Sequence, residues 1–263
     1  MDEQSSHEAT KFVEIVRING DLHSRQKDLV VKESIYLLKM NGIAVTSLAC
    51  TPTDLDRLAT GFLFSWRMIN SYADIRNILV KEDECTIDVE TLDKSEHPVV
   101  SRIGMITSGC GSGEGPLDLL RGWKVSSNLS ISASSIVKMM AKFQRASALF
   151  TSTGGVHSAA LCEQSVFLFL KEDIGRHNAV DKVIGECLMK GITMSDKMLL
   201  LTGRVSSEIL VKATLCNIPV LVSQSAPTNL AVEAARVVGI TLVGFARGER
   251  MNVYSHEERI EYG

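Results

Sequence analysis

The chain has 263 residues, with 45% hydrophobic and 22% charged residues, which is ordinary for a folded protein of one large or two modest domains. Its net charge of −3 argues against a nucleic-acid-binding surface, and apolar runs of only about five residues exclude a membrane-spanning helix, which needs roughly 20. The polar N-terminus has no apolar signal region, so we expect a cytoplasmic protein whose residues 1–11 form a disordered tail.

The first half of the chain, residues 12–125, is expected to form a smaller β-rich region. The pair Asn41-Gly42 lies between two strand-like runs and predicts a tight hairpin. Apolar residues from Leu55 to Trp66 recur at helical spacing, with Thr53 and Asp56 as a candidate capping box. Further strands are expected at residues 12–18, 75–80 and 86–89.

The second half, residues 126–263, is expected to form a separate α/β domain. A helix with a serine cap is predicted at residues 132–148, and strands then alternate with helices of 11–13 residues. Such alternation predicts βαβ units and therefore a mostly parallel sheet covered on both faces. The expected strands are 165–170, 198–202, 219–223 and 240–245, and the helices between them are 177–189, 206–216 and 227–238.

A polar segment follows each of these four strands. The carboxyl ends of parallel strands share one edge, where open α/β sheets bind ligands. Three of the segments open helices, whose free N–H groups and dipole favour an anion, so the pattern predicts a phosphorylated, nucleotide-like ligand. The alternative is that these loops are polar only because they face water and cap helices. The segments are residues 171–182, 202–208, 223–229 and 245–250, and their arginines Arg176, Arg204, Arg247 and Arg250 are candidate phosphate ligands.

Two histidines are candidate site residues. His177 and Asp181 are four residues apart at a helix start, a spacing that suits either an oriented imidazole or a structural surface pair. His157 follows a glycine pair that permits close approach of the backbone to a ligand, although a single histidine is more often a packed side chain.

The cysteines contain no CxxC spacing, so zinc-binding and dithiol motifs are absent. Five of them occur in apolar or periodic surroundings and are expected to be small buried hydrophobic residues. Cys110 is the exception, because it lies at the centre of the glycine-rich stretch TSGCGSGEGP, residues 107–116. The six cysteines are Cys50, Cys85, Cys110, Cys162, Cys187 and Cys216.

Several long motifs, in the same order, resemble those of the formate dehydrogenase accessory sulfurtransferase family. The resemblance extends over roughly residues 12–255, and the GRHNAVDK block is its most specific part. The motifs are NGIAVTSLACTPTDLDRLATGFL, TGGVHSAAL, EDIGRHNAVDK, GRVSSEILVKA, SAPTNLAVEAA and GFARGERMNVY.

The resemblance implies a fold and a function. It implies a three-layer domain similar to cytidine deaminase, a homodimer, and a sulfur carrier that receives a persulfide from a cysteine desulfurase on Cys110. The sulfur then passes to the molybdenum or tungsten of a bis-guanine-dinucleotide cofactor before this cofactor enters formate dehydrogenase. The cofactor-binding residues that the resemblance implies are Phe245, Ala246, Arg247, Gly248, Glu249, Arg250, Gly175, Arg176, His177, Asn178, Gly203, Arg204 and Ser206.

Two departures from related patterns limit this reading. Zinc deaminases carry H-x-E and P-C-x-x-C, whereas residues 157–159 read HSA here, so zinc-dependent deamination is rejected. Many family members carry CGxCG where this chain has CGSGE, so Gly113 replaces the second cysteine; a shifted alignment instead places Thr107 at the first. A cofactor-binding chaperone without sulfur transfer is therefore the main alternative, and a phosphate-binding metabolic enzyme is a third.

Overall fold

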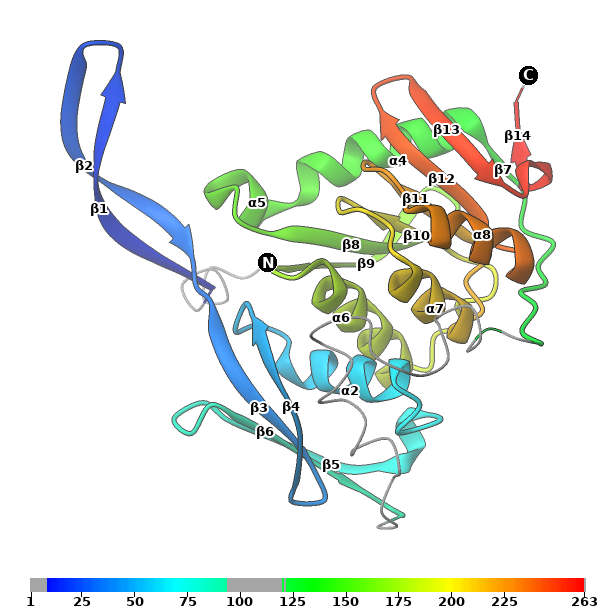
Figure 1. The fold of residues 1–263 in the computed structure, drawn as a ribbon, viewed down its shortest axis with the longest axis horizontal. Helices are drawn as coiled ribbons and strands as arrows, with labels where there is room; N and C mark the ends of the chain where they lie inside the picture. The colour runs from blue at the N-terminus through cyan, green and yellow to red at the C-terminus, as the bar shows by residue number, and fades with distance from the viewer. Residues whose placement is uncertain (1–8, 94–119, 121, 263) are drawn as a thin grey trace.

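The computed structural model describes residues 9–93, 120 and 122–262. Its N-terminal element is an antiparallel ribbon of β1 (Thr10–Asn19) and β2 (Leu22–Val31), which extends away from the rest of the molecule (Figure 1). The first strand confirms the predicted strand at 12–18, but β2 was missed because its first seven residues, LHSRQKD, are mostly polar and do not alternate.

The ribbon continues into a four-stranded sheet in the order β4–β3–β6–β5. The Asn41-Gly42 hairpin is confirmed, with both residues at positive φ (52° and 80°) between β3 and β4. Helix α2 packs on one face of this sheet and encloses a core of its own. The predicted capping box is wrong, because α2 begins after Asp54, which has left-handed backbone geometry and no side-chain cap bond. The elements are β3 (Ser34–Met40), β4 (Ile43–Cys50), α2 (Leu55–Ser65), a 3-10 turn η1 (Tyr72–Asp74), β5 (Ile75–Lys81) and β6 (Thr86–Thr91).

The second sheet has six strands in the order β13–β12–β11–β10–β8–β9. The expectation of a mostly parallel sheet is wrong, because only the β10–β11 and β11–β12 pairs are parallel and the other three pairs are antiparallel. Two of these antiparallel pairs come from an unpredicted strand, β8, which lies between β9 and β10 and is antiparallel to both, and the third is the pair of β12 with the edge strand β13. The strands are β8 (His157–Glu163), β9 (Val166–Asp173), β10 (Met198–Leu201), β11 (Val220–Ser223), β12 (Thr241–Arg247) and β13 (Arg250–Ser255).

This inserted strand leaves one important expectation intact. Because β8 is antiparallel to both neighbours, β9 runs in the same direction as β10, β11 and β12. The carboxyl ends of all four predicted strands therefore lie at one edge of the sheet.

Helices cover both faces of the six-stranded sheet, as expected (Figure 1). Successive β10 residues point to opposite faces: Leu199 and Leu201 pack with α6, α7 and α8, whereas Met198 and Leu200 pack with α4. The predicted serine cap of α4 is confirmed, because Ser132 Oγ accepts a hydrogen bond from the Ser135 N–H (3.2 Å). The helices are α4 (Ala133–Ala146), α5 (Ala148–Thr153), α6 (Arg176–Met189), α7 (Ser207–Leu215) and α8 (Asn229–Val238).

The C-terminal end is completed by a short parallel pair of β7 (Ile131–Ser132) with β14 (Ile260–Glu261), which follows a 3-10 turn η3 (Glu257–Arg259). No helix in the described part of the chain has the length and apolar character needed to cross a membrane. The likeness to cytidine deaminase and the boundary near residue 126 stay predictions.

The two regions are joined where α2 crosses α6. A Cβ atom added at Gly61 would collide with the Asp181 carbonyl oxygen, and one added at Gly185 would collide with the Arg57 carbonyl oxygen. Each helix therefore places a glycine against the backbone of the other, which permits a close crossing. Nothing in the helical periodicity of Leu55 to Trp66 indicated this role for glycine.

Candidate ligand site at the strand ends

The first two strand-end segments meet through His177 at the start of α6. Its Nε2 lies 3.2 Å from Ser206 Oγ and 3.1 Å from Glu208 Oε2, both at the start of α7. The predicted pairing of His177 with Asp181 is wrong, because the Asp181 carboxylate instead binds Lys212 (2.6 Å). One helical turn separates the two residues, and they point to different neighbours.

Hydrogen bonds to backbone carbonyls join the second segment to the third and the third segment to the fourth. The Val205 N–H donates to Ala226 (3.1 Å), which joins the second segment to the third. The Phe245 N–H donates to the Ser225 carbonyl (3.1 Å), and Arg247 Nε donates to the Gln224 carbonyl (2.7 Å), which joins the third to the fourth. All four predicted segments therefore form one continuous surface.

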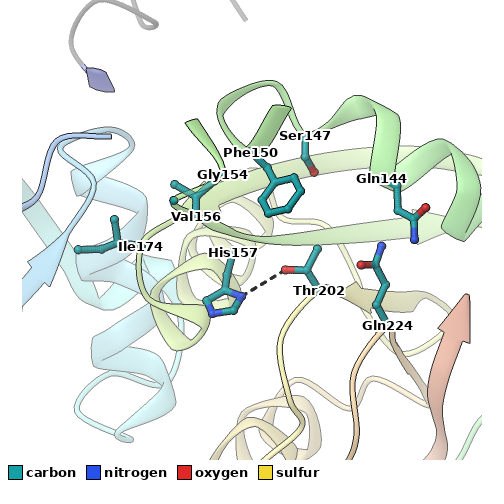
Figure 2. A pocket seen from close by; sticks show the side chains of 10 residues that line it. Gln144, Ser147, Phe150, Gly154, Val156, His157, Ile174, Thr202 and Gln224 are labelled. Atoms are coloured by element: carbon teal, nitrogen blue, oxygen red, sulfur yellow. Dashed lines mark hydrogen bonds between the residues drawn. The ribbon is translucent and has the colours of Figure 1, made fainter. Parts of the chain in front are cut away.

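A cavity of about 360 Å³ opens at this edge, within the usual size range of small-molecule sites. Its lining comes from the ends of β8, β9, β10 and β11 together with α4 and α5 (Figure 2). Among these residues, His157 and Thr202 belong to segments weighed from the sequence, whereas Gln144 and Phe150 were missed. For Gln144, the sequence predicted only the helix that contains it. A helical pattern does not indicate which polar residue of the helix reaches a cavity.

His157 lies in this cavity with its Nδ1 3.5 Å from Thr202 Oγ1 (Figure 2). Burial lowers its pKa, and the nearby positive charges of Arg176, His177 and Arg204 lower it further. The imidazole is therefore neutral at pH 7, which leaves it free to accept or donate a single hydrogen bond. The positive charges that lower its pKa are the same groups that would attract an anion.

Two of these charges are the arginines Arg176 and Arg204. The stem of Arg176 lies against Gly203, where an added Cβ would be only 3.0 Å from Arg176 Cβ. Its Nε is buried and has no hydrogen-bond partner among the described residues. Buried polar groups are usually hydrogen-bonded, so this nitrogen has an unused capacity to donate to an acceptor.

Other predicted residues have structural positions. Asn178 Nδ2 donates to Asp173 Oδ1 (2.9 Å) and to the Ala49 carbonyl (2.8 Å), so its amide fastens α6 to β4. Gly175 avoids a contact with that amide, because an added Cβ would lie 2.9 Å from Asn178 Nδ2. Ala246 is buried in the core beside α4.

The 245–250 segment ends in an exposed turn between β12 and β13. Phe245 is half-buried, whereas Arg247, Gly248, Glu249 and Arg250 are exposed. Gly248 has a φ of 57°, a left-handed geometry that favours glycine at this turn. Cys110, the predicted sulfur-carrying residue, lies outside the described residues.

The comparisons with known proteins agree over nearly the whole chain. The profile of the FdhD/NarQ family matches residues 31–261. The chain belongs to the FdhD/NarQ family.

Named relatives of this FdhD/NarQ family member include the sulfur carrier protein FdhD of Bacillus subtilis (strain 168), 37% identical over 245 residues that cover 90% of this chain and 92% of the relative. The sulfur carrier protein FdhD of Wolinella succinogenes is 38% identical over 259 residues, which cover 95% of this chain and 89% of the relative. A crystal structure described as a formate dehydrogenase accessory protein from Desulfotalea psychrophila superposes with a TM-score of 0.80 at 27% identity, covering 96% of this chain and all of that one.

Proposed function

We propose that this chain is a sulfur carrier that supports formate dehydrogenase. The observation that carries the proposal is its similarity, over at least 90% of its length, to relatives named as sulfur carrier proteins. The donor of the sulfur is a cysteine desulfurase, the recipient is the guanine-dinucleotide cofactor of formate dehydrogenase, and the carrier acts as a cytoplasmic homodimer.

Cys110 is the proposed persulfide carrier. Its thiolate attacks the terminal sulfur of the desulfurase persulfide, a new S–S bond forms on Cys110, and the donor cysteine leaves as a thiolate. Release of that sulfur at the oxidation level of sulfide requires two electrons. We assign them to an external thiol, which is left in a mixed disulfide with Cys110, because Gly113 stands at the position of the family's second cysteine.

The described cysteines support this choice. Burial raises the pKa of Cys50, Cys162 and Cys187 to about 12 and also raises that of Cys216, so these thiols stay protonated and enclosed. Cys85 was expected to be buried, but it is exposed at the turn between β5 and β6, where Leu37 N–H binds its carbonyl. It therefore serves as a natural control for an accessible thiol outside the glycine-rich stretch.

The proposed cargo is the molybdenum or tungsten bis-guanine-dinucleotide cofactor, bound as a substrate at the strand ends. A dinucleotide carries phosphates, and these suit the guanidinium of Arg204 and the Nε of Arg176, which has no partner among the described residues. Arg247 supplies a third positive charge from the 245–250 segment. The metal itself is cargo, and no protein ligand is assigned to it.

Sulfur loading tests the proposal. Wild type, Cys110→Ser and Cys85→Ser are incubated with a cysteine desulfurase and cysteine, and the added mass of one sulfur is located by peptide mass spectrometry. We expect the label on Cys110 in wild type and Cys85→Ser, and none in Cys110→Ser. A label that persists in Cys110→Ser contradicts the assignment.

The absent second cysteine favours one alternative, a cofactor-binding chaperone that transfers no sulfur. Formate dehydrogenase activity in cells that carry only Cys110→Ser separates the two functions. A sulfur carrier loses this activity with the thiol, whereas a chaperone retains it.

A further inference from the structure

Asp173 is the last residue of β9 and comes shortly before the start of α6. Its side chain is 0% exposed, so it cannot touch a ligand, and any effect that it has on binding must act through other residues. Each of its two carboxylate oxygens accepts hydrogen bonds from a different part of the molecule. The carboxylate therefore joins two regions at the point where the strand-end segments begin.

One oxygen of this carboxylate holds the start of α6. Asp173 Oδ1 accepts hydrogen bonds from the Gly175 N–H (2.8 Å) and from Asn178 Nδ2 (2.9 Å). Hydrogen bonds to an ionised carboxylate are stronger than those between neutral groups. Because Arg176 and His177 lie between the two donors in the sequence, these bonds fix the backbone from which both side chains extend.

The other oxygen holds the chain that leaves β4. Asp173 Oδ2 accepts from the Thr51 N–H (3.1 Å) and pairs with Lys182 Nζ (2.7 Å). Lys182 Nζ also donates to the Thr51 carbonyl (3.1 Å), and Thr51 Oγ1 accepts from the Ile174 N–H (3.2 Å). Thr51 is thus bound to the carboxylate, to its lysine partner and to the residue that follows Asp173.

These contacts make the position of the α6 start depend on the four-stranded sheet. A buried charge that moves away from its donors becomes costly, so the carboxylate has one strongly favoured position. A displacement of Thr51 would displace Asp173 and, through Oδ1, the start of α6. Asn178 reinforces the link, because its Nδ2 also donates to the Ala49 carbonyl (2.8 Å) in β4.

We propose that Asp173 is a positioning residue that links the four-stranded sheet to the nucleotide site, so that contacts outside the cavity set the nucleotide affinity. Asp173 orients the backbone that carries Arg176 and His177, and those side chains then meet the anionic part of the ligand. This inference rests on the proposed function, because it concerns the affinity of the same site.

Thr51→Val and Ser65→Ala are the matched pair that tests the link. Each removes one side-chain hydrogen bond between the first and second halves of the chain, since Thr51 Oγ1 accepts from Ile174 and Ser65 Oγ donates to Asp181 Oδ1 (2.8 Å). Calorimetry with the full chain measures GDP affinity, and urea unfolding measures stability. We expect both variants to lose similar stability, whereas only Thr51→Val should weaken GDP binding, by about tenfold. Ser65→Ala should bind GDP within about twofold of wild type.

Asp173→Asn is the stronger variant. An amide nitrogen cannot accept from the Thr51 N–H and does not pair with Lys182, so GDP binding should weaken more than in Thr51→Val. If Asp173→Asn does not fold, the comparison of Thr51→Val with Ser65→Ala still decides the proposal.

The titration of His157, followed by NMR without nucleotide, is a second readout that a merely structural role would not change. Burial lowers the pKa of His157, and the positive charge of Arg176 lowers it further. Thr51→Val keeps the charge of Asp173 but loosens the start of α6, so the pKa of His157 should rise toward its ordinary value. In Ser65→Ala it should stay at the wild-type value.

Two results separate the link from the proposed function. If wild type binds GDP and Thr51→Val changes neither GDP affinity nor the pKa of His157, the link is overturned while the proposed function stands. If wild type binds no GDP, the proposed cargo site is overturned, and the pKa of His157 in the two variants alone decides whether Asp173 transmits a change at Thr51 to the start of α6.

Discussion

Helix α6 takes part in two regions with opposite electrostatics. On the side that faces α2, its buried charges are paired: Lys182 binds Asp173 (2.7 Å), and Asp181 binds Lys212 (2.6 Å). At its N-terminus, where the strand-end segments meet, Arg176 has a buried Nε without a partner in the part of the chain that the structure describes. The same helix therefore has one side where these buried charges are paired and one end where a guanidinium nitrogen has no described hydrogen-bond partner.

The paired charges organise the fold, and we propose that the charges at the strand-end edge bind a ligand. A buried pair with complete hydrogen bonding stabilises one arrangement of the two helices, and removal of either partner leaves a costly isolated charge. A buried polar atom without a partner lowers stability, and under the proposed function this cost is offset when the ligand binds. Variants of the paired charges should therefore lower stability, whereas a variant of Arg176 should lower ligand affinity.

The largest effect is expected at Lys182. Its Nζ and the Asp173 carboxylate are both 0% exposed, and Nζ also donates to the Thr51 and Glu172 carbonyls. Lys182→Met leaves a buried, unpaired carboxylate and should lower the free energy of unfolding in urea by about 3–5 kcal/mol. Adding Asp173→Asn should restore part of the loss. Unchanged stability in Lys182→Met would mean that the interface does not depend on pairing.

The next effect depends on pH and concerns Glu186, which is 5% exposed and contacts Arg57, Lys171 and Lys190. Burial alone raises its pKa, but hydrogen bonds from Lys190, Lys171 and Arg57 outweigh burial and lower it from 4.5 to about 2. The depressed value stabilises the folded state above pH 4.5, and this stabilisation is lost as the pH falls toward 2.

A comparison of wild type with Glu186→Gln in urea at several pH values measures this contribution. The difference in unfolding free energy should shrink by about 3 kcal/mol between pH 6 and pH 2, because the variant lacks the titrating group. A difference that stays constant with pH contradicts the role given to these ion pairs.

A smaller loss is expected at the helix crossing. Gly61→Ala adds a methyl group against the Asp181 carbonyl and should cost about 1–3 kcal/mol, even though alanine favours a helix by about 1 kcal/mol. Chemical denaturation measures it, with Lys138→Ala on the exposed face of α4 as the control, which should change stability by less than about 0.5 kcal/mol. A stabilised Gly61→Ala would show that the helices do not cross as closely as described.

The two regions also differ in how far the sequence predicted them. The strand-end edge was predicted because β9 to β12 are apolar runs that end in polar, helix-capping segments, and this local pattern survives insertion of β8. The inserted strand was missed because a glycine pair precedes it and small residues fill it. A Cβ added at Gly155 would lie 2.8 Å from a side-chain methyl of Val31 in the ribbon, so this glycine packs against a segment distant in the sequence.

Tertiary contacts account for the other omissions. The glycine contacts at the α2–α6 crossing, and the hydrogen bonds from Thr51 to Asp173 and from Ser65 to Asp181, join residues more than 100 positions apart, so no local spacing reveals them. Gln144 and Phe150 reach the cavity only because α4 and α5 pack over the strand ends. Exposure of Cys85 follows from its place in a turn with a φ of 49°.

The most direct test compares two arginines that differ only in their surroundings. Arg57→Met removes a positive charge that is paired with Glu186 across the interface, and Arg176→Met removes a guanidinium whose Nε has no described partner at the edge, so both variants change net charge equally. GDP affinity and urea unfolding are measured for each. Arg176→Met should weaken GDP binding by about 1–3 kcal/mol with stability within about 0.5 kcal/mol of wild type, whereas Arg57→Met should lose about 1–3 kcal/mol of stability and bind GDP normally. Equal GDP binding by Arg176→Met and wild type would contradict the assignment of the strand-end edge as the nucleotide site.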